Sequence, residues 1–418
     1  MGSGEPPRLD ALHADERAVR RARPAMTSEV ALAALLSPAG AELLGYLAGQ
    51  EVTPRTALAL GTRLRAQYPA DLVAAALAQH ELRLAARDKF SRAMHMFFTR
   101  DGLEQASAEM VAWHRAARYA GAVAGRGLVA DLCCGIGGDL IALAAGHPVR
   151  AVDRDPVHLR MALANAAVYG VAGQVQAEQQ DVRLARLTGV EAAFIDPARR
   201  ASGRRLRPDA ADPPLDWCLQ LAEQLPRLGI KTAPGLAHDA VPSGWELEFI
   251  AVGRDLKEAV AWSPALAQSA TRATVLPGGH TLVPQPGLPV PVRPPGDFLL
   301  DPSPAVTRAG LVAELARAVG GWQIDRQIAF LCTPSPVHTP FARTLRVIDS
   351  APWRQRQLPA RLRRLDIGAV DIRRRGLAGD VDQLRRQLKL SGQRPATLVM
   401  TRVAGQPWGL VCVDVPAA

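Results

Sequence analysis

Four acidic residues close short strand-like runs in the middle of the chain, where carboxylates can bind a small polar ligand. Asp131 and Asp153 lie at the ends of the first two runs, Asp181 follows the third, and Asp196 follows the fourth. A carboxylate attracts an amino group and accepts hydrogen bonds from hydroxyl groups. The placement of these four acids therefore predicts one ligand-binding edge built from successive strands.

The elements that would position these acids alternate between strand and helix. Strands are predicted at 128–132, 149–152, 175–177, 192–195 and 229–231, and helices at 139–145, 156–168 and 215–225. This alternation predicts an α/β fold in which a parallel, Rossmann-like sheet has helices on both faces. In such sheets, ligands bind outside the carboxyl ends of the strands. Two further strand-like runs, 246–252 and 258–262, predict an antiparallel pair that closes the sheet.

A glycine-rich turn after the first strand narrows the choice of ligand. Gly135, Gly137 and Gly138 follow two cysteines, and Asp131 ends the strand before them. A dinucleotide fingerprint would place a pyrophosphate on the helix N-terminus, and a carboxylate at position 131 would repel it. The same carboxylate suits the amino group of a methionine moiety, and Asp153 suits ribose hydroxyls. We therefore predict S-adenosylmethionine rather than a dinucleotide, with a ligand-free glycine turn as the alternative.

This stretch resembles the cofactor-binding half of class I S-adenosylmethionine-dependent methyltransferases. In that family an acid after the third strand lies near the adenine amino group, a place that the resemblance assigns to Asp181. The segment 97–99, Phe-Phe-Thr, more loosely resembles a segment that folds over the cofactor in trimethylguanosine synthase-like enzymes. Asp139 has a second interpretation as a favourable charge at a helix start. The predicted cofactor-binding residues are Thr99, Asp131, Cys133, Gly135, Gly137, Asp139, Asp153, Arg154, Asp181 and Val182.

The residues after the fourth strand resemble a reaction centre. The run Asp196-Pro197-Ala198-Arg199 is similar to the Asp-Pro-Pro-aromatic motif of methyltransferases that act on the exocyclic amines of bases. The resemblance assigns Asp196 and Pro197 as catalytic, because they would orient the amine toward the methyl group. Ala198 and Arg199 depart from the motif, so the stacking aromatic ring is lost. The predicted substrate-binding residues are Arg199, Arg200 and Lys231, with plain surface cations as the alternative.

A second resemblance lies in the C-terminal part. Segments 373–376, 384–392 and 396–402 are similar to those of a bacterial family of class I methyltransferases that carry a C-terminal THUMP-like domain. THUMP domains bind RNA, so the resemblance implies an RNA partner by analogy. The net charge of +10 favours the same partner. The excess of arginine over lysine also fits the codon bias of a GC-rich genome.

Composition and length limit the remaining possibilities. No run reaches the roughly 18 apolar residues of a membrane helix, and the N-terminus lacks a signal-peptide core. These observations predict a cytoplasmic protein with no membrane partner. The five cysteines show no metal-ligand spacing, which predicts reduced thiols and no metal.

The chain of 418 residues is long enough for several domains. In the C-terminal part, helices are predicted at 303–319, 354–365 and 380–390, and a strand pair at 397–403 and 409–413. The predicted organisation is a disordered tail at 1–25, a helical domain at 26–87, a methyltransferase domain at 88–285, a proline-rich linker at 286–296 and a small α+β THUMP-like domain at 297–418.

Together these patterns predict an S-adenosylmethionine-dependent methyltransferase that acts on a base nitrogen of structured RNA. Two alternatives stay open. One is a methyltransferase whose substrate is a small molecule or a protein. The other is a non-catalytic RNA-binding protein that keeps the cofactor for stability.

Overall fold

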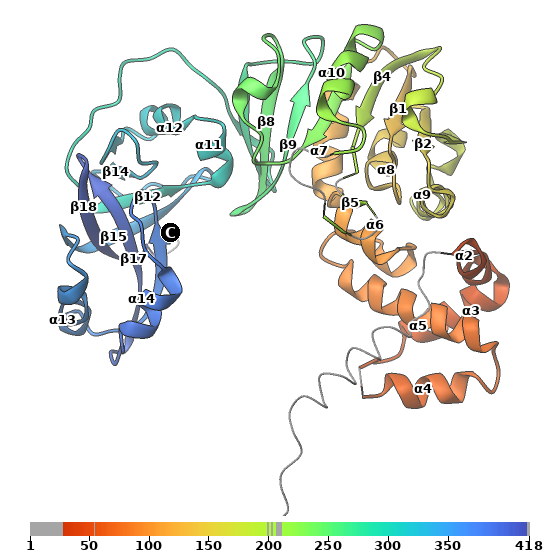
Figure 1. The fold of residues 1–418 in the computed structure, drawn as a ribbon, viewed down its shortest axis with the longest axis horizontal. Helices are drawn as coiled ribbons and strands as arrows, with labels where there is room; N and C mark the ends of the chain where they lie inside the picture. Colours follow the sequence, from red (N-terminus) through yellow and green to blue (C-terminus); the bar gives the residue numbers. More distant parts are fainter. Residues whose placement is uncertain (1–27, 54, 199, 202–203, 206–210, 416–418) are drawn as a thin grey trace, which may run out of the picture. The chain divides into compact units, whose positions relative to one another are not determined.

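The protein is described from a computed structural model that covers residues 28–53, 55–198, 200–201, 204–205 and 211–415 (Figure 1). The tail predicted at 1–25 lies outside the described residues. The chain forms two compact units, 1–228 and 229–418, and the division falls within strand β7 (Leu228–Thr232).

Four helices begin the first unit. They are α2 (Glu29–Leu36), α3 (Pro38–Ala48), α4 (Ala57–Leu64) and α5 (Ala70–Ala85). The Ser28 and Ser37 hydroxyls accept the first free backbone N–H groups of α2 and α3. Pro38 occupies the first position of α3. There the missing N–H costs nothing, since that group has no partner within the helix.

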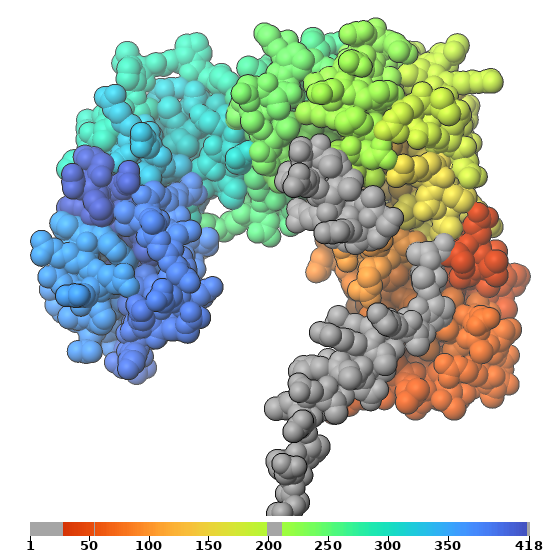
Figure 2. All heavy atoms as spheres, in the orientation of Figure 1, coloured from red at the N-terminus to blue at the C-terminus, as the bar shows by residue number. Residues whose placement is uncertain are grey.

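These helices share one hydrophobic core with the segments that follow them. Leu35 and Leu43 belong to the same buried cluster as Phe98, Ile136 and Met161. In the space-filling view, the red and orange helices pack directly against the yellow segment (Figure 2). The helical region thus packs against the elements around the glycine turn.

The sheet strands of the first unit follow the order β4-β1-β2-β3. These strands are β1 (Leu128–Leu132), β2 (Val149–Asp153), β3 (Val175–Gln179) and β4 (Val190–Ile195). Strand β2 is parallel to both of its neighbours, β1 and β3, and β4 is parallel to β1. The helices are α6 (Arg100–Gln105), α7 (Glu109–Ala120), α8 (Gly138–Ala144), α9 (Pro156–Val168) and α10 (Leu215–Gln224). A short pair, β5 (Arg200–Ala201) and β6 (Arg204–Arg205), follows β4. The predicted alternation of strand and helix is confirmed.

The second unit continues from β7 with the strand order β11-β10-β8-β9-β7. Strands β8 (Glu246–Val252) and β9 (Asp255–Trp262) are antiparallel, as predicted. The sequence analysis missed β10 (Thr271–Leu276), which is parallel to β8, and β11 (His280–Leu282), which pairs with β10.

The C-terminal part differs most from expectation, because it holds a sheet of seven strands in the order β13-β14-β12-β15-β18-β17-β16. The predicted helix at 303–319 is two helices, which separate near Gly310 at a φ of +73°. The strands are β12 (Phe298–Pro302), β13 (Trp322–Gln323), β14 (Leu331–Thr333), β15 (Ala342–Pro352), β16 (Ile367–Arg374), β17 (Arg394–Val403) and β18 (Gln406–Asp414). The helices are α11 (Pro304–Arg308), α12 (Val312–Ala318), α13 (Leu358–Arg364) and α14 (Val381–Gln387).

The predictions about cysteines and membranes can also be compared with the structure. All five cysteines are free thiols, as predicted. Within the described ranges, no single helix is long and apolar enough to cross a membrane. The two helices α2 and α3, which are joined by a bend, are together long and apolar enough to do so, by length and composition alone. No cluster of described side chains has the make-up of a metal site.

Candidate active site

Backbone pairing aligns the four predicted acids along one edge of the sheet in the first unit. The amide of Asp196 donates to the Leu132 carbonyl at 3.1 Å, and the amide of Cys134 donates to the Val152 carbonyl at 3.1 Å. Gln180, the residue before Asp181, donates to the Asp153 carbonyl at 3.1 Å. Because these strands are parallel, their carboxyl ends meet at this edge. The expectation that the acids lie at one edge is thus confirmed.

Asp131 is a buried carboxylate without a protein partner. Only 1 % of the residue is exposed, and neither of its side-chain oxygens has a hydrogen-bond partner among the described residues. Burial, followed by the charges of Asp139, Asp196 and Asp153, raises its pKa well above the ordinary value, and Arg115 opposes this rise. A buried carboxylate without a partner, close to other carboxylates, is unfavourable in its ionised form. A cationic ligand bound beside it would stabilise that form.

Asp139, which was predicted to contact the cofactor, has a protein partner. The buried Arg115 donates from Nε to Asp139 Oδ1 at 3.0 Å and pairs with the same oxygen through a second nitrogen. The Arg115 guanidinium also lies 4.7 Å from the centre of the Phe194 ring. Asp139 therefore neutralises Arg115 beneath the site, and sequence reasoning did not single out Arg115.

The glycine turn leaves room beside Asp131. Cys133 and Gly135 adopt φ angles of +63° and +53°, and a Cβ added at Gly135 would meet nothing within 4 Å. Gly137, at a φ of +88°, allows Ala162 of α9 to approach to 3.0 Å from the place of its missing Cβ. The Asp153 carboxylate holds the turn by accepting the Gly135 amide at 2.8 Å. This geometry leaves an open cradle between two acids.

The segment before the sheet folds onto this turn. Thr99 Oγ1 accepts the Gly102 amide at 2.9 Å, which begins α6, and lies 3.0 Å from His158 Nε2. A Cβ on Gly102 would lie 2.6 Å from the Ile136 side chain, so this segment contacts the glycine turn closely. The 97–99 segment therefore packs against the glycine turn, and its contact with the cofactor stays a prediction. Thr99 is 2 % exposed, and its hydroxyl already has two protein partners.

Asn165 joins these two parts, although no pattern in the sequence pointed to it. This fully buried side chain accepts the Phe97 amide at 2.7 Å and donates to the Phe97 carbonyl at 3.0 Å. It also donates to the Ile136 carbonyl in the glycine turn at 2.9 Å. One side chain on α9 thus sets the spacing between the overlying segment and the turn.

Asp181 and Arg154 take part in an ion-pair network at the same edge. Arg154 donates to Asp212 at 2.7 Å, and Arg183 pairs with both Asp212 and Asp181. The guanidinium of Arg183 is the main cause that holds the pKa of Asp212 below its ordinary value. Val182, also predicted at the cofactor, is buried in the turn that Asp181 begins. Asp212 could not be recognised from the sequence, because it follows no strand-like run.

The two residues predicted to be catalytic lie at the end of β4, and their role stays a prediction. Asp196 and Pro197 follow β4 directly, and Ala198 forms a two-way backbone bridge with Asp212 at 2.9 and 3.0 Å. Arg199 and the side chain of Arg200 lie outside the described residues. Lys231 lies within β7 in the second unit, paired in register with Val260. Its role stays a prediction.

Three parts of the chain match family models. Residues 126–196 match the RNA cap guanine-N2 methyltransferase family, 342–413 match the THUMP domain-like family, and 29–86 match a domain of unknown function. Two proteins from Mycobacterium tuberculosis strains CDC 1551 and H37Rv, described as uncharacterized S-adenosylmethionine-dependent methyltransferases, are 38% identical over 325 residues. That match spans 73% of this chain and 84% of each relative.

The chain belongs to the S-adenosylmethionine-dependent methyltransferases. A solved structure of a Porphyromonas gingivalis W83 protein, assigned as a methyltransferase, has the same fold with a TM-score of 0.68 at 19% identity. It covers 88% of this chain and all of that chain. The class I methyltransferase fold and the resemblance stated from the sequence are therefore confirmed.

S-adenosylmethionine is the cofactor of this family, and the residues present fit it. Asp131 offers two orphaned oxygens to a cationic group, and the space at Gly135 admits a ligand against the backbone. Asp153 lies beside that space, and each of its oxygens keeps lone-pair capacity beyond the one amide that it accepts. Which residues contact the cofactor stays a prediction, most directly supported at Asp131, Gly135 and Asp153.

Proposed function

We propose that this methyltransferase methylates a nitrogen of a base in structured RNA. The observation that most supports this proposal is the position of Asp196. Its charge acts on the buried Asp131, and its amide is hydrogen-bonded to the strand that leads into the glycine turn. A carboxylate there can accept a hydrogen bond from an exocyclic amine beside the cofactor. The match to the RNA cap guanine-N2 methyltransferase family ends at this same residue and supports the assignment.

The chemistry asks the protein mainly for positioning. S-adenosylmethionine, when bound, supplies a methyl group on an electrophilic sulfonium. Asp196 and the backbone after Pro197 would hold the amine so that its lone pair faces that group. Asp131 would bind the cationic end of the cofactor, and Asp153 would bind its ribose. No general base with a strongly shifted pKa is needed for this step.

RNA is the proposed partner on two grounds. The net charge of +10 favours a polyanion, and residues 342–413 match the THUMP domain-like family. Neither ground identifies the RNA species or the methylated atom. The cytoplasmic location predicted from the sequence stays a prediction that fits an RNA substrate.

Transfer of radiolabelled methyl groups tests the proposal. Purified protein is incubated with labelled S-adenosylmethionine and, separately, with total RNA, total protein and small-molecule extracts from cells that lack it. We expect label in the RNA fraction and its loss in Asp196→Ala, while Asp216→Ala, an exposed acid on α10, keeps it. Label only in the protein or small-molecule fraction favours the first alternative. Cofactor binding without label in any fraction favours the non-catalytic one.

A further inference from the structure

A groove of about 930 Å³ lies at one end of the C-terminal sheet. Strands β12, β15, β16, β17 and β18 and helix α14 all contribute to its lining. The charged residues of the lining are Arg343, Arg346, Arg385, Arg394, Asp371 and Asp414. Four guanidinium groups thus face two carboxylates in one hollow. This volume lies in the range of pockets that bind small molecules or short pieces of a polymer.

Two of the four arginines already have acidic partners. Arg343 donates from Nε to Asp414 at 2.8 Å and lies 4.0 Å from Asp371. Arg385 has a longer pairing with Asp382 at 3.5 Å. This pairing neutralises much of the charge on that side of the groove.

Arg346 and Arg394 carry the unbalanced charge. Both are exposed, and neither has an ion pair or side-chain hydrogen bond within the described part of the chain. In the register of the sheet, Arg346 stands opposite Phe298 on one side and Val413 on the other. An aromatic ring and a free guanidinium therefore lie next to each other on neighbouring strands.

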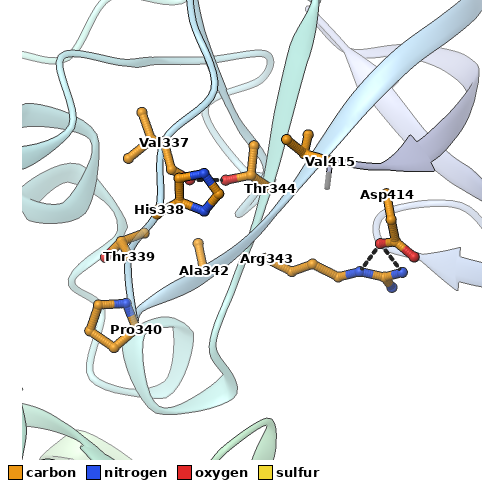
Figure 3. A pocket seen from close by; sticks show the side chains of 9 residues that line it. All are labelled: Val337, His338, Thr339, Pro340, Ala342, Arg343, Thr344, Asp414 and Val415. Atoms are coloured by element: carbon orange, nitrogen blue, oxygen red, sulfur yellow. Dashed lines mark hydrogen bonds and ion pairs between the residues drawn. The ribbon is translucent and has the colours of Figure 1, made fainter. Parts of the chain in front are cut away.

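A second hollow of about 570 Å³ adjoins the first. Figure 3 shows its lining, in which the loop from Val337 to Pro340 faces the ion pair between Arg343 and Asp414. Both hollows share Arg343, Asp414 and Val415. The groove thus continues past this ion pair, as a site for an extended ligand would.

We propose that this groove binds the sugar-phosphate backbone of the RNA substrate. The inference rests on the proposed function and adds the place where the RNA is held. Arg346 and Arg394 would contact phosphates, since a planar guanidinium matches phosphate oxygens with two parallel hydrogen bonds. Phe298 would stack on a neighbouring base. Free phosphate offers the same chemistry as a single group, so an extended ligand must be distinguished from it.

Fluorescence anisotropy of the full-length protein with a labelled single-stranded RNA of about 20 nucleotides tests the groove. Removing two phosphate contacts in Arg346→Gln/Arg394→Gln should weaken binding at least about tenfold at about 0.1 M salt. It should also reduce the slope of log K against log salt concentration by about 1.4. Arg356→Gln removes one exposed arginine outside the groove and should leave both quantities unchanged. Arg346→Lys should keep the slope of log K against log salt concentration. Phe298→Leu should weaken binding without changing this slope.

The outcomes separate this inference from the proposed function. Unchanged affinity and slope in the double variant overturn the groove, whereas labelling of RNA by the wild type still supports RNA methylation. Full competition by 10 mM inorganic phosphate also overturns it, because a small-anion site would explain the arginines. Loss of binding in the double variant, with an unchanged melting temperature and unchanged cofactor binding, supports the groove even if RNA is not the methylated substrate.

Discussion

At the scale of single residues, the site depends on a carboxylate that the fold buries without a partner. The charges of Asp139, Asp153 and Asp196 act on Asp131, and among the described residues the positive charge of Arg115 opposes them. Its raised pKa means that burial and the neighbouring acids disfavour the ionised form of Asp131 in the free protein. A cationic ligand favours the ionised form, so the two equilibria are linked.

Cofactor affinity should therefore rise with pH. As pH rises through the raised pKa of Asp131, the free protein loses stability, because ionising this buried group is unfavourable. The bound form does not incur that loss, so cofactor binding releases a proton at pH values below this pKa. Calorimetry in two buffers of different ionisation enthalpy measures the proton release. Asp131→Asn should bind more weakly and show no release from this position, and an equal release in this variant would contradict the assignment.

The positions of the acids and the glycine turn could be predicted because strand, turn and helix follow one another locally in the sequence. Arg115, Asn165 and Asp212 could not be predicted. Their partners lie 24, 68 and 58 residues away along the chain, and only the tertiary fold brings them together. Asp139 shows the same limit, since its pattern suited a cofactor contact while its partner in the fold is Arg115.

At the scale of elements, α9 controls how the 97–99 segment sits on the glycine turn. Replacing Asn165 by alanine leaves the Phe97 amide and two carbonyls buried without partners. The free energy of unfolding should fall by at least about 3 kcal/mol, since each of the three unsatisfied groups costs about 1–3 kcal/mol. Urea unfolding measures this loss. Asn165→Asp keeps the acceptor but removes both donations, so it should also destabilise; losses below about 0.5 kcal/mol in both variants would refute the joining role.

The ends of β2, β3 and β4 are linked by Asp212. It binds Arg154 and Arg183, and its backbone pairs with Ala198 next to the reaction centre. Asp212→Asn should change stability little, about 0.5–1 kcal/mol, because the paired side chains are 34–56% exposed and are screened by water. We expect turnover to fall several-fold while cofactor affinity changes less.

Methyl transfer and calorimetry on the same samples separate these two effects of Asp212. Asp216→Asn, on the exposed side of α10, serves as the matched control. The link is supported if added salt reduces wild-type turnover toward the level of Asp212→Asn. Equal losses in cofactor affinity and turnover would mean that Asp212 only holds the fold.

At the scale of the whole molecule, the first sheet could be predicted, whereas in the C-terminal sheet only the strand pair β17 and β18 could be. Continuous apolar runs marked β1 and β4, because these strands are buried on both faces. In β15 and β16 polar and apolar side chains alternate with many arginines, so they resembled irregular polar segments. The prediction of one helix at 303–319 was wrong, because Gly310 follows α11 in a left-handed conformation that ends the helix.

The central claim is that this protein methylates a base nitrogen of RNA, and nucleoside mass spectrometry tests it most directly. RNA is compared from cells with the gene, without it, and with either the wild type or Asp196→Ala restored. The account predicts one methylated nucleoside that disappears with the gene and returns only with the wild type. An identical set of modified nucleosides in all four samples would contradict it.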